Sequence, residues 1–393
     1  MTDYLIKRDV IIIGAGAAGL MCAIEAGKRG RKVSVLDHAG KTGQKILVSG
    51  GGNCNFTNIN AGPEHYISRN PHFCKSALSR FTPGDFIALL EKHGIGYYEK
   101  ENGQLFCKEG SMAVMNMLKK ECEESGVEIH LNCRISDINK QKFFKVMTNI
   151  CDLQSGSLVI ATGGLSYPKL GATGFGHMVA ERFGLKVTPL KPALVPLMFN
   201  WKTPGSFSEL RGISVKSRVS CNNKEFYGNI LFTQRGLSGP SILQISSYWN
   251  NGDAVHVDLL PDIDLCKYLN EKRQSRMEMK NFLALYFPKR FIQKWCEMNI
   301  KSKPVCRYTD KELENIVVRL KNWEIKPADM EGYDKAEVTL GGVDTDEISS
   351  RTMEAKKVPG LYFAGEVVDV TGQLGGYNLQ WAWSSGHAAG QYV

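Results

Sequence analysis

The chain has 393 residues, of which 43% are hydrophobic and 23% charged, and its formal net charge is +9. This length predicts two or three domains, and the composition is that of an ordinary soluble globular protein. No apolar run approaches the ~20 residues that a membrane-spanning helix requires. The first predicted strand begins within nine residues of Met1, which leaves no room for a signal peptide. We therefore expect a cytoplasmic protein without a membrane partner.

The positive charge raises the question of a nucleic-acid partner. Lysine and arginine residues are scattered along the sequence, and the denser patch at 272–280 is accompanied by Glu271 and Glu278. We interpret this patch as a solvated helical face and expect no nucleic-acid partner. The eleven cysteines include no C-x-x-C pair, and their odd number and irregular spacing predict neither a disulfide framework nor a metal site.

The first predicted elements form a strand, a glycine turn and a helix. The apolar run Val10–Ile13 precedes Gly14-Ala15-Gly16-Ala17-Ala18-Gly19, and residues 20–29 read as the helix. Such a turn lets backbone approach a pyrophosphate at the helix N-terminus. The next strand, residues 32–36, ends at Asp37, at the distance where a carboxylate meets a ribose hydroxyl. A glycine turn of another α/β protein is the alternative, but this context favours a dinucleotide site.

A second glycine-rich stretch follows at residues 43–58. It contains Gly50-Gly51-Gly52 followed by Asn53-Cys54-Asn55. Consecutive glycines let backbone pass close to a flat or anionic ligand. We favour a ligand loop over a flexible surface loop, because flexible linkers rarely carry so many polar residues in succession.

The remaining elements are expected to complete one α/β domain with an insertion. Residues 71–126 read as mainly helical, and apolar runs that end in glycines return the chain to the sheet at 158–164 and 360–366. Prolines and alternating patterns after residue 187 indicate a β-rich insertion, and 261–320 reads as charged helices with Trp295 and Trp323 as packing anchors. Other predicted elements are a helix at 111–125, a strand at 127–131, an antiparallel meander near 135 and 143–146, a glycine-rich loop at 167–176, a helix at 177–183, strands at 215–219, 226–232 and 254–259, and a final helix after the glycine turn at 372–376.

The fold class predicted is therefore α/β, with a Rossmann-like two-dinucleotide-fold domain on a parallel sheet, interrupted by an insertion. The predicted parts are 1–188 and 345–393 for the dinucleotide domain, 189–260 with 330–344 for a β-rich domain, and 261–329 for a helical subdomain. Glycine-rich returns at 50–52, 163–164, 365 and 375–376 are spread over the whole chain. A large cofactor buried along its length needs such close approach at several points, so FAD is favoured over NAD as the resident dinucleotide.

Several longer motifs resemble the BaiN/RdsA family of NAD(P)/FAD-dependent oxidoreductases. They are residues 43–45 with 49–58, 232–240, 341–343 with Thr352-Met353, and 360–386. The resemblance implies a flavin domain carrying an inserted β-barrel-like domain and a helical subdomain. Its members are described as aminoacetone oxidases, as reductases of 3-dehydro bile acids, or mostly as uncharacterised flavoproteins. Asn53 stands where the family usually has arginine, and Phe175 where it usually has a carboxylate.

With this resemblance, the residues expected around FAD can be named. Gly14, Ala15, Gly16, Ala17 and Ala18 would meet the pyrophosphate, Asp37 the ribose and the backbone near Ile135 the adenine. The rest of the cofactor would be surrounded by Lys45, Gly50, Gly51, Asn53, Asn55, Thr162, Gly163, Gly365, Glu366, Gly376, Tyr377, Asn378 and Leu379.

We expect the protein to transfer a hydride between flavin N5 and a small organic substrate, with NADPH or NADH docking transiently as reductant. Tyr377, Tyr167, His177 and Cys54 are the candidates for a catalytic group, although packing or flavin contact is the more common role for each. The alternatives are a flavin amine oxidase that uses oxygen, a flavin-dependent RNA-modifying protein, and a non-catalytic flavin-binding protein. An RNA substrate would call for a clustered basic face with aromatics. The sequence makes no prediction of the oligomeric state.

Overall fold

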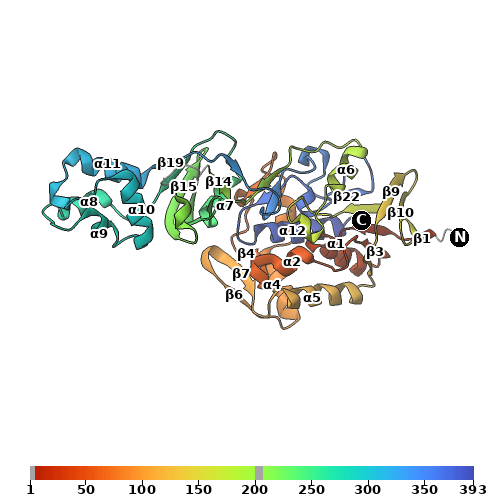
Figure 1. The fold of residues 1–393 in the computed structure, drawn as a ribbon. Helices are drawn as coiled ribbons and strands as arrows, with labels where there is room; N and C mark the ends of the chain where they lie inside the picture. The colour runs from red at the N-terminus through yellow and green to blue at the C-terminus, as the bar shows by residue number, and fades with distance from the viewer. Residues whose placement is uncertain (1–4, 200–206) are drawn as a thin grey trace. The chain divides into compact units, whose positions relative to one another are not determined.

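Figure 1 shows the computed structural model, which describes residues 5–199 and 207–393. The chain divides into two compact units. The first contains residues up to 191 together with 338–393, and the second contains residues 192–337. Each unit has its own buried hydrophobic cluster. The finer boundaries predicted from the sequence, at 188, 260, 329 and 344, stay predictions.

The centre of the first unit is a five-stranded sheet in the order β22-β12-β2-β3-β8, and every neighbouring pair of strands is parallel. Helices cover a doubly wound parallel sheet on its faces, and accordingly all four residues of β2 and of β3 are buried. The carboxyl ends of parallel strands meet at one edge, so the glycine turns that follow β2, β12 and β22 lie along the same edge. The strands are β2 (Val10–Ile13), β3 (Val33–Leu36), β8 (Glu128–His130), β12 (Ser157–Ile160) and β22 (Leu361–Phe363).

The helices of this unit include one from each end of the chain. Figure 1 shows α1 and α12 side by side, in the red and blue ends of the colour range. A Cβ atom at Gly386 of α12 would lie 2.3 Å from the carbonyl oxygen of Ala18 in α1, so this close packing requires a glycine. The helices are α1 (Ala17–Lys28), α2 (Gln44–Val48), α3 (Lys75–Arg80), α4 (Pro83–Lys92), α5 (Ser111–Glu124), α6 (Phe175–Arg182) and α12 (Tyr377–Gly390).

Three smaller sheets complete the first unit. The meander predicted near 135 and 143–146 is confirmed, because β9 and β10 pair antiparallel in a sheet ordered β1-β11-β10-β9. The prediction that 71–126 is mainly helical is wrong for β6 and β7, which join β4 in a three-stranded sheet. These strands are too short to show a period-two pattern. The strands of these three sheets are β1 (Leu5–Lys7), β4 (Asn55–Asn58), β5 (Tyr66–Ile67), β6 (Tyr97–Glu99), β7 (Gln104–Cys107), β9 (Ile135–Lys140), β10 (Phe144–Thr148), β11 (Asp152–Ser155) and β23 (Thr371–Gly372), and β5 pairs with β23. A further strand of the first unit, β21 (Val338–Leu340), lies outside these three sheets.

The second unit contains a seven-stranded sheet in the order β19-β18-β15-β16-β17-β14-β20. The edge strands β19 (Trp323–Ile325) and β20 (Asp329–Met330) are separated by residues 326–328 alone. Seven flat strands would hold their edges about 29 Å apart, whereas four Cα–Cα steps span at most about 15 Å. The sheet therefore curls on itself, as the predicted barrel-like insertion requires. The other strands are β14 (Leu197–Met198), β15 (Ser214–Cys221), β16 (Lys224–Phe232), β17 (Gly236–Ser238) and β18 (Val255–Asp258), and β13 (Lys191–Ala193) lies where the chain passes between units.

Most helices of the second unit lie along the predicted charged stretch at 261–320, and one helix, α7, precedes it. Trp295 is buried, and Trp323 packs its ring 5.1 Å from that of Phe207 and 6.4 Å from that of Phe232, measured between centroids. Both tryptophans are therefore packing residues, as predicted. The helices are α7 (Pro240–Ser246), α8 (Leu265–Glu271), α9 (Met279–Leu283), α10 (Lys289–Asn299) and α11 (Asp310–Lys321).

Candidate flavin site

The first part of the site is the turn between β2 and α1. Gly14 has a φ of 110°, and a Cβ atom there would lie 2.4 Å from the carbonyl oxygen of Ala161, so the turn requires glycine. The N-cap residue of α1, Gly16, supplies no side-chain cap. The first N–H groups of α1 therefore remain available to an anion, and the helix dipole favours a phosphate at this position.

Asp37 lies directly after β3 and supports the same turn. Its carboxylate accepts one hydrogen bond from the Ala15 N–H at 2.7 Å and another from the Ala39 N–H at 2.8 Å. The N–H of Cys133 donates to the carbonyl of Asp37 at 2.9 Å, which brings the chain leading into β9 beside this carboxylate. The predicted adenine contact, Ile135, is the first residue of β9.

Several glycines of the predicted cofactor loops have open space beside their backbone. Gly51, Gly52 and Gly163 all have positive φ, and a Cβ atom built at any of them, or at Gly16, would meet nothing within 4 Å. The hydroxyl of Thr162, immediately before Gly163, is buried and has no hydrogen-bond partner among the described residues. Polar backbone next to open space, with an unsatisfied buried hydroxyl, fits an extended polar cofactor such as FAD.

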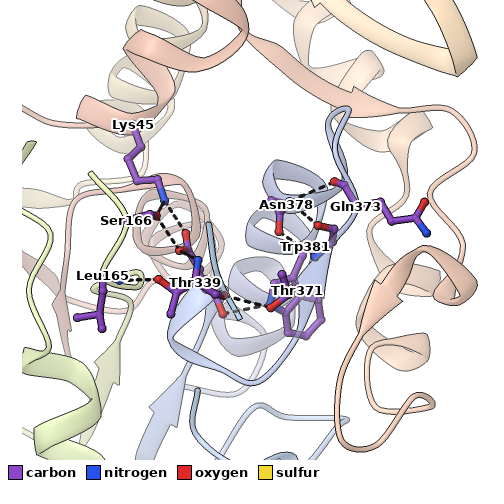
Figure 2. Close-up of polar contacts among 11 residues, drawn as sticks. Lys45, Leu165, Ser166, Thr339, Thr371, Gln373, Asn378 and Trp381 are labelled. Atoms are coloured by element: carbon purple, nitrogen blue, oxygen red, sulfur yellow. Dashed lines mark hydrogen bonds and ion pairs between the residues drawn. The ribbon is translucent and has the colours of Figure 1, made fainter. Parts of the chain in front are cut away.

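Glu366 is the centre of a polar network, shown in Figure 2, that joins three predicted contact regions. Its carboxylate pairs with Lys45 Nζ at 2.6 Å and accepts from Ser166 Oγ at 3.1 Å. Lys45 Nζ also donates to Ser166 Oγ at 2.9 Å. Lys45 lies in α2, whereas Ser166 and Glu366 follow β12 and β22, so this ion pair and its two hydrogen bonds to Ser166 join three places along the chain.

Thr339 extends this network toward β23. Its N–H donates to Glu366 at 2.9 Å, and its hydroxyl accepts from the N–H of Leu165 at 2.7 Å. The hydroxyl of Thr371 donates to the carbonyl of Thr339 at 3.1 Å. Sequence reasoning missed Ser166, Thr339 and Thr371. No local pattern in the sequence marks these three residues, because their partners lie far away along the chain.

Helix α12 supports the neighbouring Gly365. The indole Nε1 of Trp381, labelled in Figure 2, donates to the Gly365 carbonyl at 3.0 Å. The Gly365 N–H donates to Ser385 Oγ at 2.9 Å. Both side chains are buried. The last helix thus fixes both polar backbone groups of a predicted cofactor-contact residue.

The start of α12 is held by side chains as well. Asn378 accepts from the Gly372 N–H and donates to the Gly372 carbonyl, both at 2.8 Å, and it donates to the Gln373 carbonyl. With its amide oriented to satisfy its neighbours, Asn55 accepts from the Gly376 N–H at 3.2 Å. Asn55 and Asn378 therefore have internal partners, and Gly376 supplies no side-chain cap to α12. The first turn of α12 is positioned rigidly, with N–H groups left for a ligand.

The four catalytic candidates differ in burial. Cys54 is fully buried, and burial raises the pKa of its thiol to about 12. Burial also lowers the pKa of His177, whose ring nitrogens have no hydrogen-bond partner among the described residues. Burial raises the pKa of Tyr377, whose ring lies 4.7 Å from that of His65. Tyr167 is half-buried, and its ring lies 5.8 Å from Lys45 Nζ.

Within residues 5–199 and 207–393, no group of three or more His, Cys, Asp or Glu side chains could hold a metal ion, and every cysteine is free. No helix in those ranges is long and apolar enough to cross a membrane.

A doubly wound parallel sheet, with glycine turns at its carboxyl edge drawn from residues far apart in the chain, is a Rossmann-type dinucleotide-binding architecture. The family described as "HI0933-like protein Rossmann domain" matches residues 8–392, so the chain belongs to this family. The resemblance drawn from the sequence is confirmed.

Three relatives span nearly the whole chain. It is 49% identical over 390 residues to the "Ribosomal RNA dihydrouridine synthase" of Escherichia coli (strain K12), covering 98% of each chain. A Haemophilus influenzae protein of the same name is 48% identical over 397 residues, covering 99% of this chain and 98% of that one. The "3-dehydro-bile acid delta(4,6)-reductase" of Clostridium scindens is 29% identical over 403 residues, covering 97% of each chain.

One prediction from the sequence is contradicted by these relatives. We expected no nucleic-acid partner, because the basic residues looked scattered and no basic face was found. The two relatives near 50% identity carry names that state an RNA substrate, so this expectation is wrong. The expectation failed because a linear sequence does not show which basic segments lie side by side in the folded protein.

Proposed function

We propose that this protein reduces a uridine of ribosomal RNA to dihydrouridine. The observation that carries the proposal is the 49% identity to the Escherichia coli ribosomal RNA dihydrouridine synthase along 98% of both chains. The bile acid reductase relative is also named for a reduction, but at lower identity. The small organic substrate expected from the sequence is therefore replaced by a base within a large RNA.

Conversion of uridine to dihydrouridine adds a hydride to C6 and a proton to C5, and it removes the double bond between them. FAD, when bound and reduced, supplies the hydride equivalent. We assign Gly14 to Ala18 to its pyrophosphate, Asp37 to its ribose, and the first turn of α12 to the flavin end. In this assignment Lys45 and Glu366 serve chiefly to hold the surrounding loops in register, since they are paired with each other.

The proton at C5 needs a donor, and we favour Tyr167 among the four candidates. It is half-buried, whereas Cys54, His177 and Tyr377 are buried. The ammonium of Lys45 near the Tyr167 ring would stabilise the phenolate that remains after the proton leaves. Lys45 would then act as a positioning residue through its bonds to Glu366 and Ser166.

NADPH or NADH is proposed as the source of electrons. No second G-x-G-x-x-G motif is present in the sequence, so the nicotinamide would bind transiently rather than on a separate domain.

The test uses purified holoenzyme under anaerobic conditions. Flavin absorbance is followed after addition of NADPH or NADH, and the reduced enzyme is then mixed with unmodified ribosomal RNA transcripts. We expect the flavin to reoxidise and dihydrouridine to appear in nucleoside digests analysed by mass spectrometry. Reoxidation by enones, or by oxygen after reduction with amines, without any dihydrouridine in RNA would contradict the proposal. A second arm expresses the protein in Escherichia coli lacking its own relative and measures whether dihydrouridine returns to the ribosomal RNA.

A further inference from the structure

Two segments of the second unit lie side by side between its helices. Residues 272–278 connect α8 to α9, and residues 300–309 connect α10 to α11. Backbone hydrogen bonds of 3.0 Å join the segments, from Met279 N–H to Lys303 O, from Val305 N–H to Met277 O and from Cys306 N–H to Ser275 O. Most of the stretch at 272–280 is therefore one half of a paired structure rather than the helical face that the sequence suggested, and only Met279 and Lys280 lie in a helix, α9.

This pairing concentrates positive charge. Residues 272–280 and 301–307 together contain seven lysine and arginine residues and a single acidic residue, Glu278. Arg273 pairs with Asp310, and Lys303 with Glu312. The other five are exposed and form no ion pair among the described residues. We call these five the basic ridge: Lys272, Arg276, Lys280, Lys301 and Arg307.

The acids beside the ridge do not neutralise it. The Glu278 carboxylate accepts a hydrogen bond from Ser302 Oγ at 3.1 Å, which ties it to the pairing of the two segments. Glu271 is the last residue of α8 and lies outside the hydrogen-bonded part. Five unpaired cations on two adjacent segments repel one another, which is a cost that a bound polyanion removes.

We propose that the basic ridge binds the phosphate backbone of the RNA substrate, an inference that rests on the proposed function. Charge complementarity favours RNA as the occupant, because five exposed lysines and arginines without an ion-pair partner among the described residues can bind the phosphates of its backbone. A membrane surface would in addition require large apolar side chains for insertion. Met277 is the one large hydrophobic residue of the two segments, 272–280 and 301–307, that is exposed.

The test compares RNA binding by the full-length holoenzyme and by the triple variant Arg276→Gln, Lys280→Gln, Arg307→Gln. The probes are overlapping transcripts of the ribosomal RNAs, labelled with a fluorophore and titrated by anisotropy at 50–200 mM salt. The slope of log K against log salt is negative, and each lost phosphate contact reduces its magnitude by about 0.7–0.9. For the triple variant we therefore expect the magnitude of this slope to fall by about 2–3. The RNA affinity at low salt should drop at least about tenfold.

The matched control is Lys7→Gln, Lys119→Gln, Lys142→Gln, which removes three exposed lysines from the first unit. It should leave the salt slope within about 0.5 of wild type. A rescue variant, Arg276→Lys with Arg307→Lys, keeps the charge and should retain most of the binding. Circular dichroism and flavin content confirm that each variant is folded. Equal affinity and slope in wild type and ridge variant would overturn the inference.

Two further outcomes separate this inference from the proposed function. The rate of dihydrouridine formation at limiting RNA is compared between wild type and ridge variant. Equal rates would refute RNA binding by the basic ridge and leave the proposed function intact. Absence of dihydrouridine from wild type refutes the proposed function, while the binding titration, which needs no turnover, still decides the ridge. Binding to phosphatidylserine vesicles that depends on the ridge, with no effect on RNA binding, would also overturn the inference.

Discussion

At the scale of single residues, Asp37 is expected to act on the cofactor through two routes. We propose that it meets the ribose, and it already accepts a hydrogen bond from the Ala15 N–H in the turn between β2 and α1. We predict that Asp37→Ala weakens FAD affinity about tenfold or more without unfolding the chain, since one charge-assisted hydrogen bond contributes about 1.5–3 kcal/mol. Fluorescence titration of deflavinated protein measures the dissociation constant. Unchanged affinity and full flavin content in the purified variant would contradict the role of Asp37.

Tyr167 provides the second residue-scale prediction. Tyr167→Phe removes the phenolic proton but keeps the ring beside Lys45. In stopped flow, flavin reduction by NADPH should be unchanged, whereas reoxidation by RNA should slow by about 10²–10⁴, the usual contribution of a positioned general acid. Tyr377→Phe is the matched control and should leave reoxidation within a few-fold of wild type. If Tyr377→Phe alone slows reoxidation, the assignment of the proton donor is wrong.

The residue scale also shows what the sequence could and could not predict. Gly14 and Asp37 could be recognised because a pyrophosphate turn depends on local spacing within about 25 residues. The Lys45–Glu366 ion pair joins positions 321 residues apart, and no local pattern indicates such a partner. Both residues were named as cofactor contacts, but their pairing and the part of Ser166 required the structure.

At the scale of elements, Glu121 joins three helices of the first unit. From α5 its buried carboxylate contacts Lys28 in α1 at 3.3 Å, Lys92 at the end of α4, and the adjacent His93 at 2.7 Å. Burial alone would raise the pKa of this carboxyl, but hydrogen bonds from Lys92, His93 and Lys28 lower it to about 2. The cluster therefore stabilises the folded chain as long as Glu121 is ionised.

The prediction for this cluster concerns stability and pH. The folded-state pKa of Glu121 lies below its unfolded value, so its stabilisation is complete above about pH 5 and is lost as pH falls toward 2. Glu121→Gln should lower the free energy of unfolding by about 2 kcal/mol at pH 7. The difference from wild type should shrink in acid. Glu124→Gln, whose side chain is exposed on the same helix, is the control and should cost under about 0.5 kcal/mol. A deficit that is independent of pH would contradict the account.

Element prediction succeeded for the strands of the parallel sheet and for repeated helical patterns, and it failed for β6 and β7. The helix predicted at 111–125 corresponds to α5, Ser111–Glu124, within one residue, because its apolar positions repeat over several turns. β6 and β7 were missed because they have only three and four residues and are not continuous apolar runs, so their sequences do not distinguish a strand from a helical turn. They are Tyr97–Glu99 and Gln104–Cys107.

At the scale of the whole molecule, the two units have separate hydrophobic clusters. The described glycine turns and strand ends of the flavin site belong to the first unit, so FAD should stabilise that unit selectively. Free FAD at about 100-fold its dissociation constant contributes about 2.7 kcal/mol, which should raise the unfolding temperature of the first unit by roughly 5–10 °C.

Hydrogen exchange read by mass spectrometry measures this effect, because peptides from each unit report separately. Peptides of α1 and α12 should gain protection as FAD is added, whereas peptides of β15 and β16 should not. Equal protection of both sets would show that the units unfold together. The Asp37→Ala variant should require more FAD for the same gain.

The contacts of α12 with Gly365 have a consequence for protein synthesis. β2, α1 and the Gly14 turn are translated first, but Trp381 and Ser385, which hold Gly365, are translated more than 300 residues later. Gly386, which lets α12 pack on α1, also comes late. The chain must therefore keep an unfinished cofactor site until α12 has been made. Products that stop before Tyr377 lack this helix and should not retain flavin.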